Sequence, residues 1–462
     1  MDKISELKKI KAYINASGKS TREFIKAITD DLSFVEMDTY YKTNDNSNDP
    51  GEGVICGFAR INDSPAYIFA LNTDAQKGLS RHQADKILRC MESAEKSGYP
   101  LIAILNSLGA VVDDGLMPLD GYARIIAKAS SLYGVIPQIS IIKGECLGSF
   151  SFYAALSDFV FMLKDSVLCS SSPLVIAAKS GKNSDAKALF GADIHYSKTG
   201  IASRVCPDVT ELSKELKALL SLFDEDIVEE DLGALNKISL KLNSVYSTAE
   251  IISGVFDKNS FFEISANFGG ELICGLGKLG GFTVGAVLGK DGENVVLTSN
   301  ACKKASKFIR FLDSFDIPLI SFVNCEGIES NLQSEQGNLI KDFANLISAV
   351  ADGQNVKLSV ICGNVAAAGY IALAGKGLGF DYTLAWATSS INILPANVSV
   401  EVLESAALAA AKNPKKEREA LKVKVLETDG NPVNAAYKGL VDNVIEPSNT
   451  RSYLLSVLMM LN

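Results

Sequence analysis

The chain has 462 residues, of which 47% are hydrophobic and 21% are charged, so it has enough apolar material for two or three domains with large cores. Its formal net charge of -9 argues against a general electrostatic attraction to nucleic acid or to an anionic membrane. The nine cysteines form no CxxC pair and most stand in apolar runs, which predicts buried free thiols in a reducing compartment. The start of the chain lacks a signal-peptide pattern and no apolar run reaches the ~18 residues of a spanning helix, so a soluble, cytoplasmic protein is expected.

The chain begins with a helical segment, residues 1–50, which ends in a polar loop. A β-hairpin follows, with strands over 55–61 and 66–71, and then an amphipathic helix with apolar residues at helical spacing. Short apolar strands then alternate with loops and helices. This alternation is typical of a buried, mostly parallel sheet, so the fold class is α/β.

The same order of elements occurs a second time. Pro100 and Gly144 have counterparts in Pro318 and Gly363, 218 and 219 residues later, each within a similar apolar string. Ser80, a predicted helix N-cap, maps at the same spacing to Ser299. A second hairpin is predicted over 272–279 and 282–288, and a second amphipathic helix carries apolar residues at Ala305, Phe308, Ile309, Leu312 and Phe315.

These matches predict two tandem domains of similar fold. We place the first over residues 51–225, a charged and then weakly helical linker over 226–260, and the second over 261–462.

Ligands of α/β sheets gather at the carboxyl ends of the strands, so the loops after the buried strands are the candidate sites. Two backbone N–H groups from two such loops can converge on one oxygen and form an oxyanion hole, which requires small residues nearby. The glycines could instead only end strands and cap helices, but their duplicated placement favours a function. The candidates in the first domain are Gly109, Ala110, Gly148 and Ser149, with Gly144 nearby; those in the second are Gly327, Ile328, Ala367 and Ala368, with Gly363 and Gly369 nearby.

Side chains suited to catalysis are scarce. His82 lies in a polar helix start and is expected to be solvated, and His195 is expected to be satisfied by the backbone. Residues 275–280 match GxGxxG, but a strand follows them, whereas a dinucleotide fingerprint requires a helix. No metal-binding pattern is predicted.

The chain resembles the carboxyltransferase subunits of biotin-dependent acyl-CoA carboxylases and the related glutaconyl-CoA and methylmalonyl-CoA decarboxylase subunits. The resemblance runs from about Gly53 to Arg451. It rests on residues 137–146, 158–165, 261–264 and 385–386, on Gly191-Ala192, His195 and Gly200-Ile201-Ala202, and on C-terminal Asn431-Pro432, Gly439-Leu440-Val441-Asp442 and Thr450-Arg451.

The resemblance implies two crotonase-like (ClpP/crotonase) domains with ββα repeats and an active site at a dimer interface. It implies that the first-domain loops hold an acyl-CoA thioester enolate, and that the second-domain loops of a partner subunit hold the ureido oxygen of biotin. Because the chain has neither a Met-Lys-Met biotinylation sequence nor an ATP-grasp portion, biotin is expected on a separate carrier protein. The implied partners are a biotin carboxyl carrier protein with a biotin carboxylase or a membrane decarboxylase subunit, and a second copy of the chain in a homodimer or higher oligomer.

Several loop residues depart from the family pattern. The first loop lacks the family's arginine and reads Leu108-Gly109-Ala110-Val111, and the first Gly-Gly is Gly148-Ser149. In the second domain the expected glycines become Ala367 and Ala368. Each added Cβ narrows the approach to the backbone and restricts φ, which affects the biotin side most.

Three functional hypotheses follow. The first is carboxyl transfer between carboxybiotin and an acyl-CoA, and the second is a subunit of such a complex that has lost catalysis. The third is a crotonase-type CoA hydrolase or isomerase that does not use biotin. It requires a side-chain base facing Gly109 or Gly148, for which Glu145 is the nearby candidate.

Overall fold

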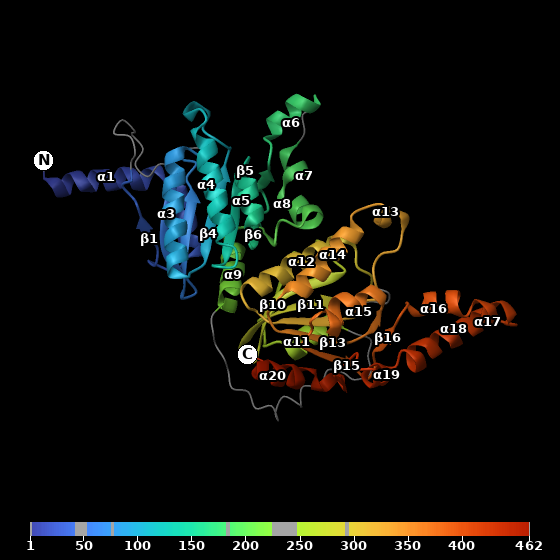
Figure 1. The fold of residues 1–462 in the computed structure, drawn as a ribbon. Coiled ribbons are helices and arrows are strands. Elements are labelled where there is room, and N and C mark those ends of the chain that lie inside the picture. The colour runs from blue at the N-terminus through green and yellow to red at the C-terminus, as the bar shows by residue number, and fades with distance from the viewer. Residues whose placement is uncertain are drawn as a thin grey trace. The chain divides into compact units, whose positions relative to one another are not determined.

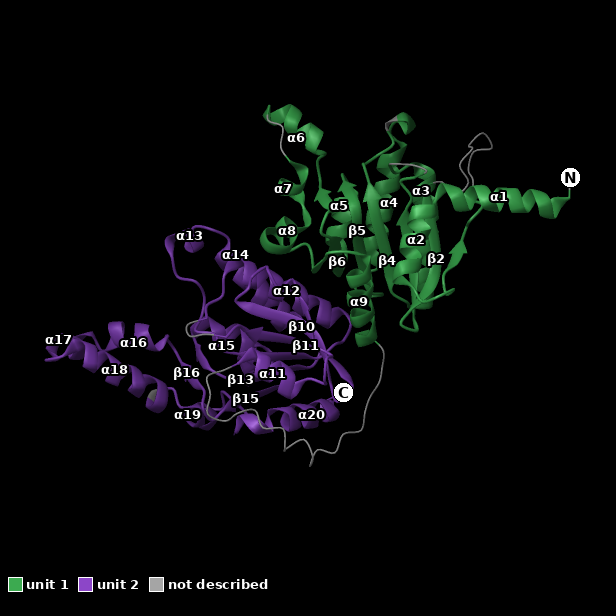
Figure 2. Cartoon of the chain, turned by 180° about the vertical axis from the view of Figure 1, so that it is seen from behind, with its two compact units in different colours: residues 1–224 green, residues 225–462 purple. Residues whose placement is uncertain are grey.

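Figure 1 shows the computed structural model of the chain, in which residues 2–41, 53–74, 78–181, 185–223, 247–291 and 295–461 are described. The chain divides into two compact units, Met1–Asp224 and Glu225–Asn462 (Figure 2). Each unit is built around its own mixed sheet and its own hydrophobic core.

The first unit contains an eight-stranded sheet in the order β1-β2-β3-β4-β5-β6-β8, with β7 paired to the end of β5. The β1–β2 and β2–β3 pairs are antiparallel and the other pairs are parallel. The strands are β1 (Val35–Met37), β2 (Val54–Ile61), β3 (Ser64–Leu71), β4 (Leu101–Ser107), β5 (Gln138–Leu147), β6 (Phe159–Leu163), β7 (Val167–Cys169) and β8 (Arg204–Cys206). The helices are α1 (Lys3–Ser17), α2 (Lys19–Ile28), α3 (Arg81–Ser97), α4 (Met117–Ser131), α5 (Phe150–Leu156), α6 (Pro173–Ser180), α7 (Ala186–Phe190), α8 (Ala192–Ile194) and α9 (Val209–Leu220), with a π-helical turn over His195–Thr199.

The second unit contains a seven-stranded sheet in the order β17-β15-β13-β12-β11-β10-β9, and β14 forms a separate parallel pair with β16. The strands are β9 (Phe262–Ile264), β10 (Leu272–Leu279), β11 (Phe282–Gly289), β12 (Leu319–Val323), β13 (Lys357–Ile361), β14 (Asn364–Ala366), β15 (Tyr382–Trp386), β16 (Ser390–Asn392) and β17 (Asn443–Ile445). The helices are α11 (Thr248–Val255), α12 (Ser299–Ser314), α13 (Leu332–Glu335), α14 (Leu339–Asp352), α15 (Ala367–Ala374), α16 (Ala396–Leu403), α17 (Ser405–Ala410), α18 (Pro414–Lys424), α19 (Pro432–Tyr437) and α20 (Thr450–Leu461).

The two sheets repeat one topology. In each unit an antiparallel hairpin (β2–β3 or β10–β11) leads through one long helix (α3 or α12) to two central parallel strands. These central strands, β4–β5 and β12–β13, are buried because their apolar side chains pack on both faces of the sheet. The predicted duplication is therefore confirmed.

The starts of the two long helices show one difference from the prediction. Ser80 caps α3 as predicted, since its Oγ accepts the N–H of Gln83 at 3.4 Å and the Gln83 side chain accepts the Ser80 N–H at 3.0 Å. In the second unit the cap is Thr298, which accepts the N–H of Ala301 at 3.2 Å. The prediction of Ser299 was wrong by one residue, because Ser299 is already the first helical residue.

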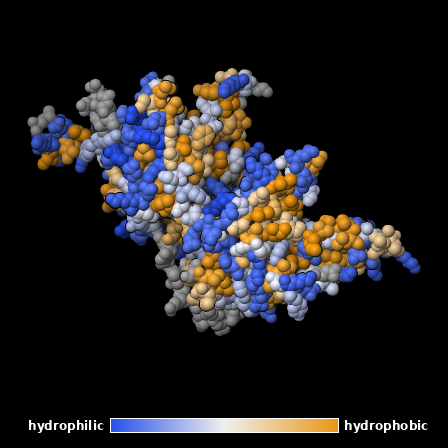
Figure 3. Space-filling model, in the orientation of Figure 1, coloured by the Kyte–Doolittle hydropathy of each residue, from blue (hydrophilic) through white to orange (hydrophobic). Residues whose placement is uncertain are grey.

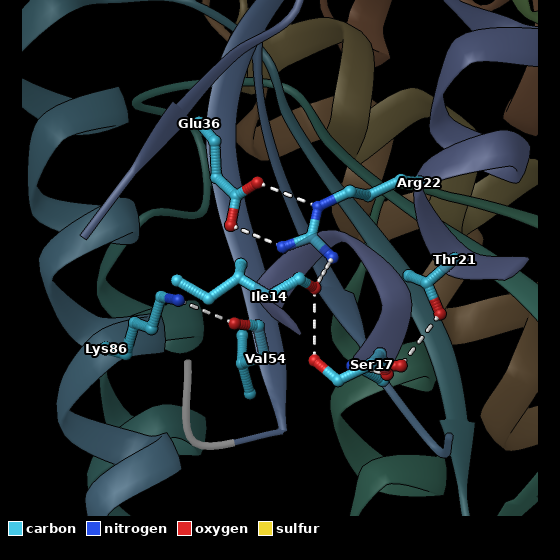
Figure 4. Close-up of polar contacts among 8 residues, drawn as sticks. Ile14, Ser17, Thr21, Arg22, Glu36, Val54 and Lys86 are labelled. Atoms are coloured by element: carbon cyan, nitrogen blue, oxygen red, sulfur yellow. Dashed lines mark hydrogen bonds and ion pairs between the residues drawn. The ribbon is translucent and has the colours of Figure 1, made fainter. Parts of the chain in front are cut away.

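The N-terminal segment belongs to the first unit. Ile25 and Ile28 of α2 are buried, and β1 adds an edge strand that was not predicted. Figure 4 shows how the segment is held: the Arg22 guanidinium donates to both Glu36 carboxylate oxygens at 3.0 and 2.9 Å and to the Ile14 carbonyl at 2.8 Å. A bidentate pair of this kind fixes both distance and orientation, so α2 and β1 are locked together.

The predicted linker, 226–260, is only partly described, since residues 224–246 lie outside the described residues. Its described end contains α11, whose Ile251 and Val255 are buried in the core of the second unit. That end is therefore part of the second unit and does not act as a linker, because burying two branched apolar side chains favours docking by about 3–6 kcal/mol.

Two other sequence expectations, on the cysteines and on the second hairpin, are also confirmed. All nine cysteines are buried free thiols. The GxGxxG match, residues 275–280, lies on β10 and the hairpin turn, and the strand β11 follows it, as expected. Among the described helices, none is long and apolar enough to cross a membrane.

Candidate active site

The first candidate loop of the first unit follows β4 and is fixed by Leu79. The Leu79 N–H donates to the Gly109 carbonyl at 2.8 Å, and the Val111 N–H donates to the Leu79 carbonyl at 3.0 Å. In a parallel bridge of this kind the residue between the two bonds directs its own N–H to the opposite side. Ala110 therefore points its N–H away from Leu79, and no described residue accepts a hydrogen bond from it.

Gly109 itself is not a free donor. Its φ of +108° is a conformation that glycine adopts without strain, and its N–H donates to Ser107 Oγ at 3.2 Å. Of the two predicted residues in this loop, Ala110 is the one that offers an unused amide.

The second candidate loop follows β5, and here too the glycine N–H is hydrogen-bonded whereas the N–H of the next residue is not, among the residues that the structure describes. Gly148 has a φ of +72°, and its N–H donates to the Cys169 carbonyl on β7 at 3.0 Å. The next residue, Ser149, precedes α5, and its N–H has no acceptor within the described part of the chain.

The two loops lie close together. A Cβ atom built on Gly148 would lie 3.7 Å from Gly109 Cα, which is van der Waals contact. The predicted residues of the first unit are thus brought together, and two free amides, those of Ala110 and Ser149, belong to adjoining loops at the carboxyl end of the sheet. Adjacent free amides on two loops are the elements of an oxyanion hole.

The second unit repeats this backbone arrangement. The Leu297 N–H donates to the Gly327 carbonyl at 2.9 Å and the Glu329 N–H donates to the Leu297 carbonyl at 3.0 Å, so Ile328 directs its N–H away from Leu297. A Cβ built on Gly327 would lie 3.8 Å from Ala367 Cβ, and the Ala366 N–H donates to the Cys325 carbonyl at 3.2 Å, so these two loops also lie side by side.

Ala367 occupies the position equivalent to Gly148, with a φ of +46°. An alanine in this left-handed region costs roughly 1–2 kcal/mol. The following residue, Ala368, lies in the first turn of α15, and its N–H has no acceptor among the residues described. The approach to the backbone of this loop is narrower than in the first unit, because Ala367 places a Cβ beside Gly327. The backbone at Ala367 nevertheless keeps the positive φ of Gly148.

At the three remaining predicted positions, close packing explains why the residue is glycine. A Cβ on Gly144 would lie 2.7 Å from Asn106 Oδ1, a Cβ on Gly363 would collide with Asn324 Oδ1, and a Cβ on Gly369 would collide with the Cys325 carbonyl. They allow the strands and α15 to approach the loops closely. A role of these three glycines in cofactor binding stays a prediction.

A cavity of about 730 Å³ opens beside the loops of the second unit. Its lining includes Ala367, Tyr370, Ile371, Asn392, Asn434 and Lys438. The volume is in the usual range for small-molecule sites, and a mostly apolar wall with a few amide groups is the usual lining of such a site. Apart from Ala367, none of these residues was predicted as a site residue, although the sequence around Asn434 contributes to the family resemblance.

The titratable side chains near the loops of the first unit include His195 and Glu145, and Glu326 is a buried carboxylate directly before Gly327 in the second unit. His195 is buried, with Nε2 2.6 Å from the Leu168 carbonyl and Nδ1 3.0 Å from Thr199 Oγ1, so it is satisfied within the fold as predicted. Burial lowers the pKa of His195, and the hydrogen bonds to backbone carbonyls oppose that shift only in part. Glu145 is exposed on β5, on the same strand face as Leu147.

This architecture defines a class: two crotonase-like domains in tandem, each with two loops that lie close together at the carboxyl ends of its central strands. Comparison with known proteins identifies the family. A family model described as "Carboxyl transferase domain" matches residues 15–462. The chain belongs to this carboxyl transferase family.

Relatives and solved structures agree with this assignment. The chain is 32% identical to the carboxyltransferase subunit of propionyl-CoA carboxylase from Haloferax mediterranei, over 96% of this chain and 90% of that protein. It is 30% identical to methylmalonyl-CoA decarboxylase subunit alpha from Veillonella parvula, over 97% of this chain and 91% of that protein.

Among solved structures, transcarboxylase 12S, a hexamer with methylmalonyl-coenzyme A and methylmalonic acid bound, matches with a TM-score of 0.87 at 26% identity. That match covers 99% of this chain and 94% of the other. A single-chain long-chain acyl-CoA carboxylase has the same fold, with a TM-score of 0.84 at 18% identity, over 100% of this chain and 50% of the other. The predicted family and fold class are confirmed.

Proposed function

We propose that the chain is the carboxyltransferase component of a biotin-dependent acyl-CoA carboxylase or decarboxylase. The first unit binds the CoA thioester and holds its enolate oxygen with the N–H groups of Ala110 and Ser149. The second unit holds the ureido oxygen of biotin with the N–H groups of Ile328 and Ala368. The observation that carries the proposal is that, among the described residues, both units of a carboxyl transferase family member have the same two loop amides without a hydrogen-bond acceptor.

The proposed chemistry needs two places where negative charge is stabilised and no further acid or base. Loss of the carboxyl group from a malonyl-type CoA leaves an electron pair that is delocalised onto the thioester oxygen, and its loss from carboxybiotin would leave an electron pair that is delocalised onto the ureido oxygen. Backbone amides that are already oriented stabilise such charge without reorganisation, each by about 3 kcal/mol. Since carboxybiotin can itself supply the base, the burial of His195 is no objection.

The cavity beside Ala367 suits the biotin side. Its apolar wall, with Tyr370 and Ile371, fits the fused rings and chain of biotin, and Asn392 and Asn434 offer amide groups to a neutral ureido ring. Biotin would arrive on a separate carrier protein, as the sequence leads us to expect.

An oligomer is part of the proposal, because exposed apolar residues gather on helices near the carboxyl ends of the strands. Leu174 on α6 is 81% exposed, and Val402 and Leu403 on α16 are 59% and 70% exposed. Figure 3 shows hydrophobic residues on the surface of the arm that carries α16 and α17. Apolar surface of this kind is typical of subunit interfaces, so we propose a homodimer or higher oligomer.

The test incubates the chain with malonyl-CoA or methylmalonyl-CoA and a biotinylated carrier protein, with and without avidin. Avidin-sensitive decarboxylation supports the proposal. CoA-thioester binding without turnover selects a structural subunit that has lost catalysis, for which the strained Ala367 is the supporting observation. Turnover that avidin leaves unchanged selects a biotin-independent hydrolase or isomerase.

A matched variant further distinguishes biotin-dependent carboxyl transfer from a biotin-independent hydrolase or isomerase. Glu145→Gln removes the nearby exposed carboxylate that the biotin-independent reaction would need as its base. Carboxyl transfer should proceed in this variant at a rate within about twofold of wild type, whereas the third hypothesis requires a loss of roughly 10²–10⁴-fold.

A further inference from the structure

The short strand β7 holds the second loop of the first unit through backbone hydrogen bonds. Its three residues pair in parallel with the end of β5, with Cα partners Glu145–Val167, Cys146–Leu168 and Leu147–Cys169. Its last carbonyl, that of Cys169, accepts the N–H of Gly148. The direction of the Gly148 peptide, and with it the direction of the next amide, that of Ser149, therefore depends on where β7 lies.

Val167 and Cys169 of β7 pack against Ala186 and Phe190 of α7, and His195 adds a hydrogen bond to the strand. The Leu168 carbonyl lies 2.6 Å from His195 Nε2, and because a carbonyl only accepts, Nε2 must carry the proton. The other ring nitrogen, Nδ1, lies 3.0 Å from the Thr199 hydroxyl. Both ring nitrogens therefore have polar partners within the fold.

The local backbone explains why the ring reaches β7. The residue before α8, Gly191, forms a bridge with Val167, and a side chain at Gly191 would collide with the Lys187 carbonyl. After α8 the chain widens into the π-helical turn His195–Thr199, in which the Thr199 hydroxyl comes within reach of the ring. Helix and strand are thus joined both by a backbone bridge and by the imidazole.

The second unit has the corresponding strand pair, β14–β16, but it is held differently. There the Ile391 N–H donates to the Gly430 carbonyl at 2.8 Å, a bond between two backbone groups. The imidazole support is specific to the first unit, which is the unit that we assign to the CoA thioester.

We infer that His195 is a positioning residue for the acyl-CoA side: its ring fixes β7 through the Leu168 carbonyl, and β7 fixes Gly148 so that the Ser149 N–H faces the thioester oxygen. This inference rests on the proposed function of the first-unit loops. His195 does not act as an acid or base, because both of its nitrogens are bound within the fold and its side chain is buried.

The test compares His195→Ala with His195→Gln, whose side-chain amide nitrogen can replace Nε2 as a donor to Leu168. Carboxyl transfer is measured in the assembled complex with methylmalonyl-CoA and the biotinylated carrier. We expect kcat to fall about 10- to 100-fold in His195→Ala, less than or equal to the loss of a whole oxyanion donor, while KM stays within about twofold. We expect His195→Gln to recover most of kcat. The control is His82→Ala, which changes the other histidine of the chain and should leave both constants unchanged.

Hydrogen–deuterium exchange provides a readout that does not depend on activity. The amide of Gly148 is protected by its bond to Cys169, so peptides that contain residues 147–152 should exchange faster in His195→Ala and at the wild-type rate in His195→Gln. If His195→Ala fails to fold, Thr199→Val removes only the hydroxyl partner of Nδ1 and should give a smaller change of the same kind.

Two results would overturn the inference: unchanged exchange over residues 147–152 in His195→Ala, or an unchanged kcat in an active enzyme. If wild-type protein turned over no CoA thioester, the proposed function would fail, and the exchange experiment alone would still decide whether His195 holds the loop.

Discussion

Exchanging the residues at two equivalent backbone positions, by Gly148→Ala and Ala367→Gly, should change stability in opposite directions. Both positions have a left-handed backbone, with φ of +72° and +46°. An alanine there costs roughly 1–2 kcal/mol in the folded state, and replacing glycine by alanine recovers about 0.4–1 kcal/mol through the unfolded chain. A Cβ on Gly148 meets only Gly109 Cα at 3.7 Å, so no collision adds to this balance. The expected net change is about 0.5–1 kcal/mol, destabilising for Gly148→Ala and stabilising for Ala367→Gly.

Calorimetric unfolding measures this difference. For units of more than 200 residues, 1 kcal/mol corresponds to about 2–4 °C in Tm, so the two variants should shift the transitions of their own units by about 1–4 °C in opposite senses. In activity assays Gly148→Ala should lower kcat/KM at least about tenfold, because its methyl group narrows the approach to the Ser149 N–H. A lower stability of Ala367→Gly would refute the reasoning, since it would mean that the alanine is favoured there by packing.

Three further predictions test other contacts. Ser107→Ala removes the acceptor of the Gly109 N–H and should lower kcat about tenfold with an unchanged KM; an unchanged kcat in the transfer assay would show that this bond does not hold the loop. Burial acts to raise the pKa of Asp257, but bonds from two glycine N–H groups and from Arg451 hold the pKa below its ordinary value. Asp257→Asn should therefore destabilise the second unit by about 1–3 kcal/mol at pH 7. In urea titrations the gap to wild type should persist above about pH 4, the unfolded pKa, and close as the pH falls through the lowered folded pKa; a gap that widened in acid would contradict the assignment. Leu403→Asp should shift the protein to smaller species in light scattering without changing its circular dichroism spectrum, and an unchanged mass would exclude α16 from the subunit interface.

Much of the fold could be predicted because its signals are local. The hairpins, the long helices and the central strands all follow from hydrophobic spacing, and the Ser80 capping box can be recognised from four consecutive residues. The features that were missed depend on distant partners. β7, β14 and β16 are only three residues long, and each exists because a strand or loop far away in the chain pairs with it.

The same distinction applies to the site. The sequence indicates which glycine-containing loops follow buried strands, and these loops do meet in each unit. It does not indicate which amide of each loop is free, because that is decided by Leu79, Ser107 and Cys169, whose bonds to the loop glycines appear only after folding. The cavity beside Ala367 was missed for a related reason: its walls come from segments that the sequence separates widely.

The most direct measurement is a structure of the chain with an unreactive CoA thioester that carries a planar enolate-like group, such as 2-nitropropionyl-CoA. We expect the thioester oxygen to lie within about 3.2 Å of both the Ala110 and the Ser149 nitrogens. A ligand oxygen bound by side chains, or one that contacts neither amide, would contradict it.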